Sequence, residues 1–155
     1  MEVHVATLAD FGPWLVLAQE VEPLFGPMVA EPSFHQALKD AFRASCAFCI
    51  RAEAAQPGDP LCGGIVIAPE ANELAWFAIA ERYQGCGFGK ALLAHALSQL
   101  DPNRDVTVQT FDATSKAGAP ARGLYQRFGF TDHQAGPPTP TGIPTVFMIR
   151  EGTPR

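Results

Sequence analysis

The chain has 155 residues, of which 47% are hydrophobic and 17% charged, a composition typical of a globular protein with its own core. Its net charge is −5, and its 11 lysines and arginines form no run, which excludes a nucleic-acid binder that must neutralise phosphates. No apolar run approaches the ~20 residues that a membrane span requires, and the first residues lack a secretory-signal pattern. We therefore expect a single soluble, cytoplasmic domain over residues 1–155.

The N-terminal half alternates between strand and helix patterns. Residues 3–7 are alternating and β-branched, which predicts a first strand, and apolar residues at helical spacing follow up to Val21. Residues 22–28 hold two prolines and a glycine, so we expect a loop that either lines a pocket or packs on the core. The next predicted elements are a helix and two strands joined by a loose turn: Pro32 or Ser33 to about Ala44, 47–53 and 61–68.

The C-terminal half places a glycine-rich turn between a strand and a helix. A fourth strand is predicted over 72–80 and runs into residues 81–89, after which apolar residues from Phe88 to Leu100 recur at helical spacing. The remaining predicted elements are a fifth strand, a short helix capped by a glycine, a strand that opens at Phe130 and a last strand: 105–111, 119–128, from 130 and 143–150.

The turn Gln84-Gly-Cys-Gly-Phe-Gly-Lys90 is suited to binding phosphate. Glycines let successive backbone N–H groups converge on an anion, and the N-terminus of the following helix adds partial positive charge. A side chain at Gly87 or Gly89 would stand between the backbone and a pyrophosphate. The alternative is a tight turn whose glycines serve only its dihedral angles. The run matches neither the dinucleotide fingerprint nor the nucleoside-triphosphate loop.

The turn resembles the coenzyme A signature of the GCN5-related N-acetyltransferase (GNAT) superfamily, Gln/Arg-x-x-Gly-x-Gly/Ala, matched at Gln84, Gly87 and Gly89. The segment 121–130 resembles the second signature of that family, a short helix that carries a tyrosine, here Tyr125, and ends in Gly-Phe. The order of predicted elements also matches the family. The resemblance implies an α+β domain with three layers, α/β/α, and a mixed, mostly antiparallel sheet that is splayed between its fourth and fifth strands.

The resemblance also implies an activity, the transfer of an acetyl group from acetyl-coenzyme A to a primary amine by direct attack, with no metal. Tyr125 would protonate the leaving thiolate, and a backbone N–H near Ile79 would face the thioester carbonyl. The coenzyme would be held by the fourth strand, the glycine turn and the segment after the fifth strand, where the family often has an asparagine: Phe77, Ala78, Ile79, Gln84, Gly85, Cys86, Gly87, Phe88, Gly89, Lys90 and Asp112.

The attacking amine also needs a base and a binding site. An alkylammonium with a pKa near ~10 must lose a proton before it attacks. Glu73 and Glu81 flank the fourth strand, where the family often places a carboxylate or a water held by one, and a solvated surface charge is the alternative for each. Phe25 and Trp76 are candidates for substrate contact, although Trp76 also fits a core position. The negative net charge favours polyamine, aminoglycoside or peptide amines over acidic ones, and a terminal strand could pair across a homodimer.

Two other functions fit the glycine turn, a catalytically silent module that binds or senses acyl-coenzyme A and a nucleotide-binding protein. Only the enzyme predicts that Tyr125→Phe lowers turnover and leaves affinity nearly unchanged. A zinc site is not predicted, because Cys46 and Cys49 have the spacing of half a site and no second pair accompanies them. We expect all four cysteines to be free thiols: Cys46, Cys49, Cys62 and Cys86.

Overall fold

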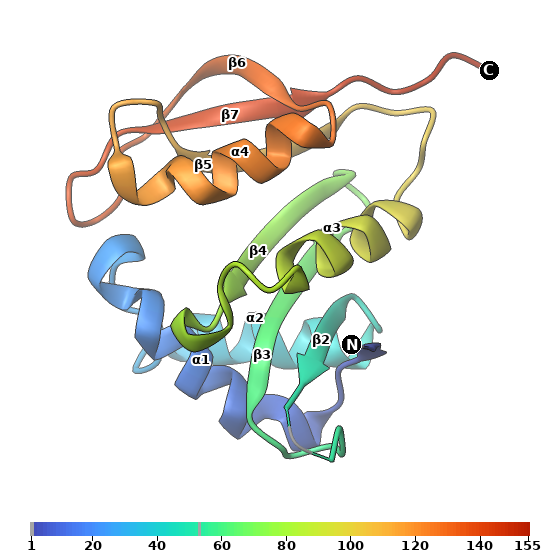
Figure 1. The fold of residues 1–155 in the computed structure, drawn as a ribbon, viewed down its shortest axis with the longest axis vertical. Helices are drawn as coiled ribbons and strands as arrows, with labels where there is room; N and C mark the ends of the chain where they lie inside the picture. Colours follow the sequence, from blue (N-terminus) through green and yellow to red (C-terminus); the bar gives the residue numbers. More distant parts are fainter. Residues whose placement is uncertain (1, 53) are drawn as a thin grey trace.

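A mixed sheet of seven strands runs through the computed structural model, which describes residues 2–52 and 54–155 (Figure 1). The strand order is β1-β2-β3-β4-β5-β7-β6. Neighbouring strands pair antiparallel except β4 and β5, which are parallel. The strands are β1 (Val3–Val5), β2 (Ala47–Arg51), β3 (Leu61–Ala68), β4 (Glu73–Ile79), β5 (Val106–Phe111), β6 (Thr131–Gly136) and β7 (Thr145–Arg150).

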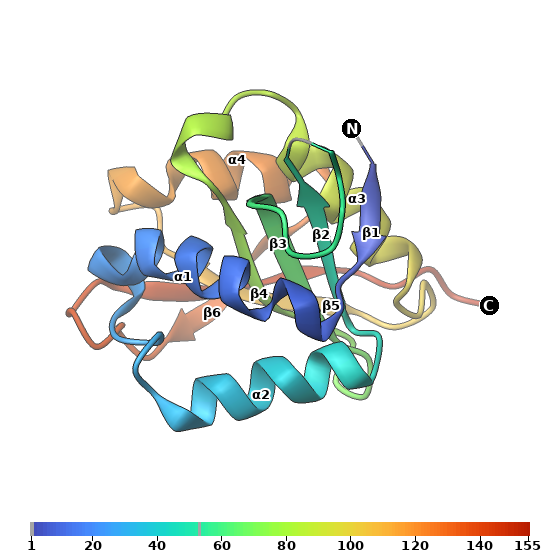
Figure 2. The same cartoon turned by 90° about the horizontal axis from the view of Figure 1, so that it is seen from below.

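Helices cover both faces of the sheet, α1 and α2 on one side and α3 and α4 on the other (Figure 2). Their bounds are α1 (Phe11–Phe25), α2 (Pro32–Arg43), α3 (Phe88–Ser98) and α4 (Ala119–Arg127), with short 3₁₀ helices η1 (Leu8–Asp10), η2 (Glu81–Tyr83) and η3 (Lys116–Gly118). This arrangement confirms the predicted three-layer fold class. Within the described ranges, no helix combines the length and the apolar character needed to cross a bilayer.

Each face of the sheet carries its own apolar cluster, and the helices on that face pack closely against it. Leu92, Leu93 and Ala96 of α3 pack in the larger cluster, and Trp14 and Leu17 of α1 pack in the other. Two adjacent glycines in β3 make room for both helices. A Cβ atom at Gly63 would lie 3.1 Å from Leu92, and one at Gly64 would lie 2.6 Å from Trp14 on the other side.

One expectation about the end of an element was wrong. Helix α1 continues through Pro23 to Phe25, where we expected a loop from residue 22. A proline inside a helix removes one hydrogen bond, but tertiary contacts stabilise this last turn, because Phe25 stacks on Phe111 with ring centroids 4.8 Å apart. The last strand, β7, lies between β5 and β6, so only β1 and β6 of the described strands have a free edge for a partner strand.

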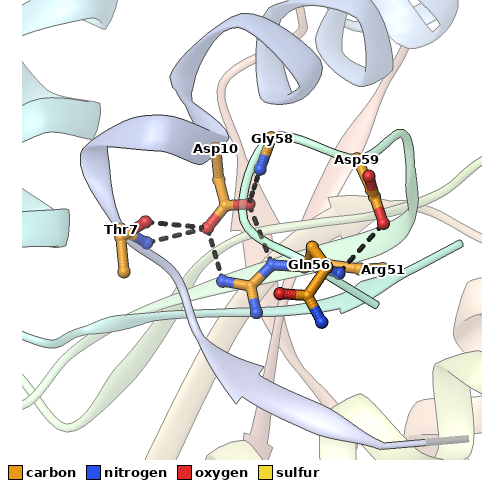
Figure 3. Close-up of polar contacts among 6 residues, drawn as sticks. All are labelled: Thr7, Asp10, Arg51, Gln56, Gly58 and Asp59. Carbon is orange, nitrogen blue, oxygen red and sulfur yellow. Dashed lines mark hydrogen bonds and ion pairs between the residues drawn. The ribbon is translucent and has the colours of Figure 1, made fainter. Parts of the chain in front are cut away.

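A buried ion pair holds the N-terminal segment on the sheet (Figure 3). Asp10, at the end of η1, accepts hydrogen bonds from Arg51 of β2 and from the backbone N–H groups of Thr7 and Gly58. The segment that carries Thr7 and Asp10 is therefore tied to residues 51 and 58, more than forty positions further along the chain.

Strands β4 and β5 pair only at their first residues, which leaves a gap along the rest of their length. Their register is Glu73 with Thr107 and Leu74 with Val108, and no further pairs join the two strands. The closed end of this gap is fixed by Asn72, whose side chain bonds the backbone of Asp101, Arg104 and Asp105. The predicted splay is therefore present, and it creates the site described next.

Candidate active site

A β-bulge at the start of β4 decides which side chains enter the gap. Trp76 pairs with Val66 and Leu74 pairs with Ile67, so Ala75 has no partner on β3. As a result, Leu74 and Phe77 both pack on the α3 and α4 side, although they are three residues apart, and Trp76 packs on the α1 and α2 side. Glu73 precedes Leu74, so its side chain points to the other face of the sheet, the one covered by α1 and α2.

A cavity of about 450 Å³ occupies the gap and extends between the C-terminal end of α1 and the loop that joins β6 to β7. This volume lies within the range of ~300–1,000 Å³ that small-molecule sites have. Four elements and the β6–β7 loop supply the lining residues used below: Phe25 from α1, Glu73, Trp76 and Phe77 from β4, Gln109 and Phe111 from β5, Tyr125 from α4, and Pro140 from the loop. Met28, which follows α1, and Phe147 of β7 also belong to the apolar part of the lining.

Tyr125 reaches the cavity from α4 and is only 4% exposed. Its ring lies 6.2 Å from that of Phe77 and 5.6 Å from that of Phe130, which fixes its orientation. Burial raises the pKa of Tyr125, because the phenolate would lose its hydration. Its hydroxyl forms no hydrogen bond with another described residue, so a protonated O–H group is available to a ligand in the cavity.

Glu73 and Gln109 line the cavity together with four threonines: Thr107, Thr110, Thr139 and Thr145. Glu73 is half-buried and lies in register with Thr107, at the point where β4 and β5 begin to separate. Gln109 donates its amide to the hydroxyl of Thr145 at 3.1 Å and to the carbonyl of Pro137 at 3.5 Å. The side-chain nitrogen of Gln109 is thus held against the β6–β7 loop, and its side-chain oxygen accepts no hydrogen bond from a described residue.

Two backbone N–H groups of β4 point toward the gap. The backbone N–H of Ala80 donates to the carbonyl of Cys62 in β3 at 2.8 Å. Successive N–H groups of a strand point to opposite edges, so those of Phe77 and Ile79 are directed at β5, with which β4 forms no pairs beyond Leu74. The carbonyl of Ile79 accepts from the side chain of Gln84 at 3.4 Å, which links β4 to the glycine turn.

The glycine turn leads directly into α3 and adopts backbone conformations that favour glycine. Gly85 and Gly87 have φ of +77° and +83°, and Gly87 is the N-cap of α3. Residues 84–87 and Lys90 are exposed, so their backbone is open to a ligand. Gly89 differs from the sequence-based interpretation, because a Cβ atom there would meet Leu124 at 3.2 Å and Phe77 at 3.5 Å. Glycine at 89 serves the packing of α3 against α4 and β4.

Several predicted site residues do not line the cavity. Ala78 is buried in the cluster under α1 and α2. Glu81 is exposed, and its backbone N–H donates to the carboxylate of Glu20 of α1 at 3.3 Å. Asp112 is held in a local turn by the N–H and hydroxyl of Thr114, and these hydrogen bonds lower its pKa. Of the two candidate bases, therefore, only Glu73 faces the cavity.

The structure also adds residues that the sequence did not single out for the site. Gln109 was read only as part of a strand, and Phe111 and Phe147 carried no motif. Alternation along β5 placed Gln109 and Phe111 on one face, but nothing in the sequence indicated that this face borders a gap. Met28 belongs to the segment 22–28 for which the sequence left a pocket lining open, and it does line the cavity.

The comparisons with known proteins agree with this geometry. A family model described as "Acetyltransferase (GNAT) domain" matches residues 45–132, which include the gap, the glycine turn and Tyr125. A [ribosomal protein bS18]-alanine N-acetyltransferase of Haemophilus influenzae is 42% identical over 55 residues, a segment that spans 36% of this chain and 36% of that protein.

Solved structures share the fold over nearly the whole chain. The crystal structure of a ribosomal-protein-alanine N-acetyltransferase from Brucella melitensis superposes with a TM-score of 0.73 at 18% identity, covering 97% of this chain and 99% of that one. A chain of the NatC complex bound to Gag peptide and CoA superposes with a TM-score of 0.70 at 17% identity, covering 99% and 100%. With the family model matching more than half of its length, this chain belongs to the GNAT family of acetyltransferases.

Proposed function

We propose that this protein is an N-acetyltransferase that moves the acetyl group of acetyl-coenzyme A to a primary amine by direct attack. The observation that carries the proposal is the gap between β4 and β5: one carboxylate and one protonated phenol line its cavity, and two backbone N–H groups of β4 point toward the gap. These are the groups that the reaction needs for a base, an acid and an oxyanion site. Two relatives are named as ribosomal-protein-alanine N-acetyltransferases, and these names support the same reaction class.

The residues present fit coenzyme A as a cosubstrate. The exposed turn at Gln84–Lys90 offers backbone N–H groups at the N-terminus of α3, whose first turn holds no acidic residue. We propose that this turn holds the pyrophosphate through its seven residues, Gln84, Gly85, Cys86, Gly87, Phe88, Gly89 and Lys90. The pantetheine arm would follow the edge of β4 at Phe77, Ala78 and Ile79, and Asp112 is a more distant candidate contact.

Glu73 is the proposed base. It takes a proton from the ammonium group of the acceptor, directly or through a water, because a protonated amine has no lone pair for attack. The nitrogen then attacks the thioester carbonyl carbon. The N–H groups of Phe77 and Ile79 donate to the oxygen on which negative charge develops, and fixed donors at that point stabilise the transition state without reorganising.

Tyr125 is the proposed acid. When the tetrahedral intermediate collapses, the carbon–sulfur bond breaks and the sulfur leaves with the electron pair. The Tyr125 hydroxyl hydrogen-bonds to that sulfur and gives it a proton. Its raised pKa keeps the phenol protonated at every ordinary assay pH, so the donor is always present. The four free cysteines fit a reducing compartment, and we propose the cytoplasm. A homodimer would form through the free edges of β1 or β6.

Calorimetric titration with acetyl-coenzyme A tests the first step. We expect micromolar binding that Gly87→Glu abolishes, since the substitution places bulk and negative charge beside the pyrophosphate. Gly142→Glu is the matched control, because Gly142 also has a positive φ, +86°, and open space around it, but lies in the β6–β7 loop. A wild-type protein that binds no acetyl-coenzyme A would rule out the proposed function, as would full binding by a folded Gly87→Glu variant.

A further inference from the structure

We infer that Glu22 is a positioning residue of the proposed acetyltransferase, because its carboxylate fixes the turn after α1 and thereby the wall of the cavity that the acceptor meets. The inference rests on the proposed function and adds to it a residue outside the lining of the cavity. Glu22 touches neither substrate in this account and acts through Met28.

The turn between α1 and α2 is organised by Glu22, which lies in the last part of α1. Its backbone carbonyl accepts the N–H of Gly26 at 2.8 Å. Oε2 of its side chain accepts the N–H groups of Met28 at 2.6 Å and of Val29 at 3.0 Å. These bonds hold the pKa of Glu22 below its ordinary value, so the side chain is ionised near neutral pH and both bonds are charge-assisted. One side chain therefore fixes the backbone of two successive residues of the turn.

Met28 connects this turn to the sheet. Its side chain lines the cavity, and its sulfur accepts the indole N–H of Trp76 in β4 at 3.5 Å. The ring of Trp76 also lies 5.5 Å from that of Trp14 in α1 and 6.4 Å from that of Phe34 in α2. A methionine side chain has three rotatable bonds and adapts to its surroundings, so the position of its sulfur depends on where its backbone is held. Glu22 holds that backbone and, with it, the contact between two side chains that line the cavity.

The wall formed by Met28 and Trp76 lies on the acceptor side of the cavity. Tyr125, the proposed acid for the leaving sulfur, enters from α4, and the glycine turn proposed for the coenzyme leads into α3. Glu73, the proposed base, points to the opposite face, which α1 and α2 cover. Because the thioester carbon must lie between acid and base, the amine comes from the side of α1 and α2 and meets this wall.

Removal of the carboxylate should leave the fold intact. The carbonyl oxygen of Val29 lies within hydrogen-bond distance of Nε2 of His35 in α2, and the carbonyl of Met28 accepts the N–H of Glu31 at 2.9 Å. These contacts keep the turn attached to α2. The property that depends on Glu22 is therefore the placement of Met28 against the sheet.

Quenching of tryptophan fluorescence by acrylamide tests this placement without reference to activity. The chain has two tryptophans; Trp14 is 0% exposed and Trp76 is partly exposed, so the quencher reaches Trp76 preferentially. We expect Glu22→Ala to raise the quenching constant roughly two-fold, because the turn opens locally and Met28 no longer covers the indole. Glu22→Gln should keep the wild-type value, since an amide oxygen also has two lone pairs for the two N–H groups.

Steady-state kinetics of the full chain with saturating acetyl-coenzyme A tests the consequence for the acceptor. The probes are phenylethylamine, spermidine and a hexapeptide with an N-terminal alanine, and the one with the highest wild-type turnover is used. We expect Glu22→Ala to raise KM for this probe about ten-fold and to change kcat less than about three-fold, because the reacting groups stay in place. The Kd for acetyl-coenzyme A should not change, and Glu22→Gln should restore KM.

Two further variants locate the effect. Glu31→Ala removes the same charge from the same turn, where Glu31 is exposed and its side chain forms no capping hydrogen bond, and it should change neither quenching nor KM. Met28→Ala should raise KM as Glu22→Ala does. In the Met28→Ala background, Glu22→Ala should add nothing, because residues that act through one contact are not additive.

The outcomes separate the inference from the proposed function. Unchanged KM in Glu22→Ala, equal effects of Glu22→Ala and Glu31→Ala, or a lower kcat together with weaker coenzyme binding each overturn the inference and leave the acetyltransferase standing. Binding of acetyl-coenzyme A without acetylation of any probe by the wild type overturns the proposed function, and the positioning role falls with it. If Glu22→Ala does not fold, Glu22→Gln and Met28→Ala still decide, since full KM in the first and raised KM in the second are both required.

Discussion

Asp10 and Arg51 form a two-point ion pair inside the protein, with Nη2 of Arg51 2.7 Å from Oδ2 of Asp10 and Nε 3.0 Å from Oδ1. The two side chains are 0% and 4% exposed. The N–H groups of Thr7 and Gly58 also donate to the carboxylate, at 2.8 Å and 3.4 Å. The pair thus joins η1, β2 and the turn before β3, and it places α1 over the face of the sheet that carries Trp76.

Asp10→Asn should lower the free energy of unfolding by ~3–5 kcal/mol, because it leaves the guanidinium of Arg51 buried without a counter-charge. Urea denaturation measures the loss. Asp40→Asn is the matched control, since Asp40 pairs with Arg43 on the surface of α2, where both side chains are more than half exposed, and its removal should leave the midpoint unchanged. Equal effects of the two substitutions would contradict the role of burial.

The same carboxylate makes stability depend on acid pH. Burial by itself would raise the pKa of Asp10, but the hydrogen bonds of Arg51, Thr7 and Gly58 and the charge of Arg51 outweigh it, so the pKa lies below 3.8. In the unfolded chain the group takes up a proton near pH 3.8, before the folded protein does. The contribution is therefore complete above that pH and is lost as the pH falls below it. We expect a steeper loss of stability below pH 4 for the wild type than for Asp10→Asn, as measured by urea titrations across that range.

Tyr125→Phe should lower kcat roughly 100-fold and leave the Kd for acetyl-coenzyme A nearly unchanged, because it removes only the proton donor for the leaving sulfur. Turnover assays combined with calorimetry measure the two effects separately. Tyr83→Phe, which removes a hydroxyl near the glycine turn, should retain turnover. Loss of binding in Tyr125→Phe would show a structural role, and unchanged turnover would favour a silent acyl-coenzyme A module.

Asn72 controls the closed end of the gap. It is 1% exposed, and its side chain accepts from the N–H of Asp101 and donates to the carbonyls of Asp101, Arg104 and Asp105. Asn72→Asp replaces the donor with a carboxylate that faces these carbonyls, and we expect at least ~2 kcal/mol of destabilisation together with weaker acetyl-coenzyme A binding. Urea denaturation and calorimetry check both. The exposed Asn103 of the same loop, changed to Asp, should alter neither substantially.

Two glycines should respond in opposite ways to alanine. Gly64→Ala places a methyl group within 2.6 Å of Trp14 and should destabilise by ~1–3 kcal/mol, because α1 has no room to move away. Gly12→Ala, in α1 with no atom within 4 Å of the added Cβ, should stabilise by up to ~1 kcal/mol through helix propensity. Thermal unfolding measures both, and destabilisation by the second substitution would contradict the open space at Gly12.

The sequence by itself determined the elements and the family. Hydrophobic periodicity located α2, β3 and α3 within a few residues, because each buries one face and the spacing of its apolar residues records that face. The glycines at 85 and 87 were recognisable because few other residues adopt a positive φ. Tyr125 stood in a motif of local spacing, so it could be named before its surroundings were known.

Only the tertiary structure decided what surrounds the cavity. The bulge at Ala75 and the surroundings of Gln109 depend on contacts between different strands and loops. The contact of Thr141 with Leu24 joins residues more than a hundred positions apart. The spacing of residues along the sequence does not predict such contacts. Net charge favoured polyamine, aminoglycoside or peptide amines over acidic ones, and only the structure locates Glu73, the one carboxylate among the residues that line the cavity. Pro23 remained helical for the same reason, since contacts from β5 outweighed the local preference.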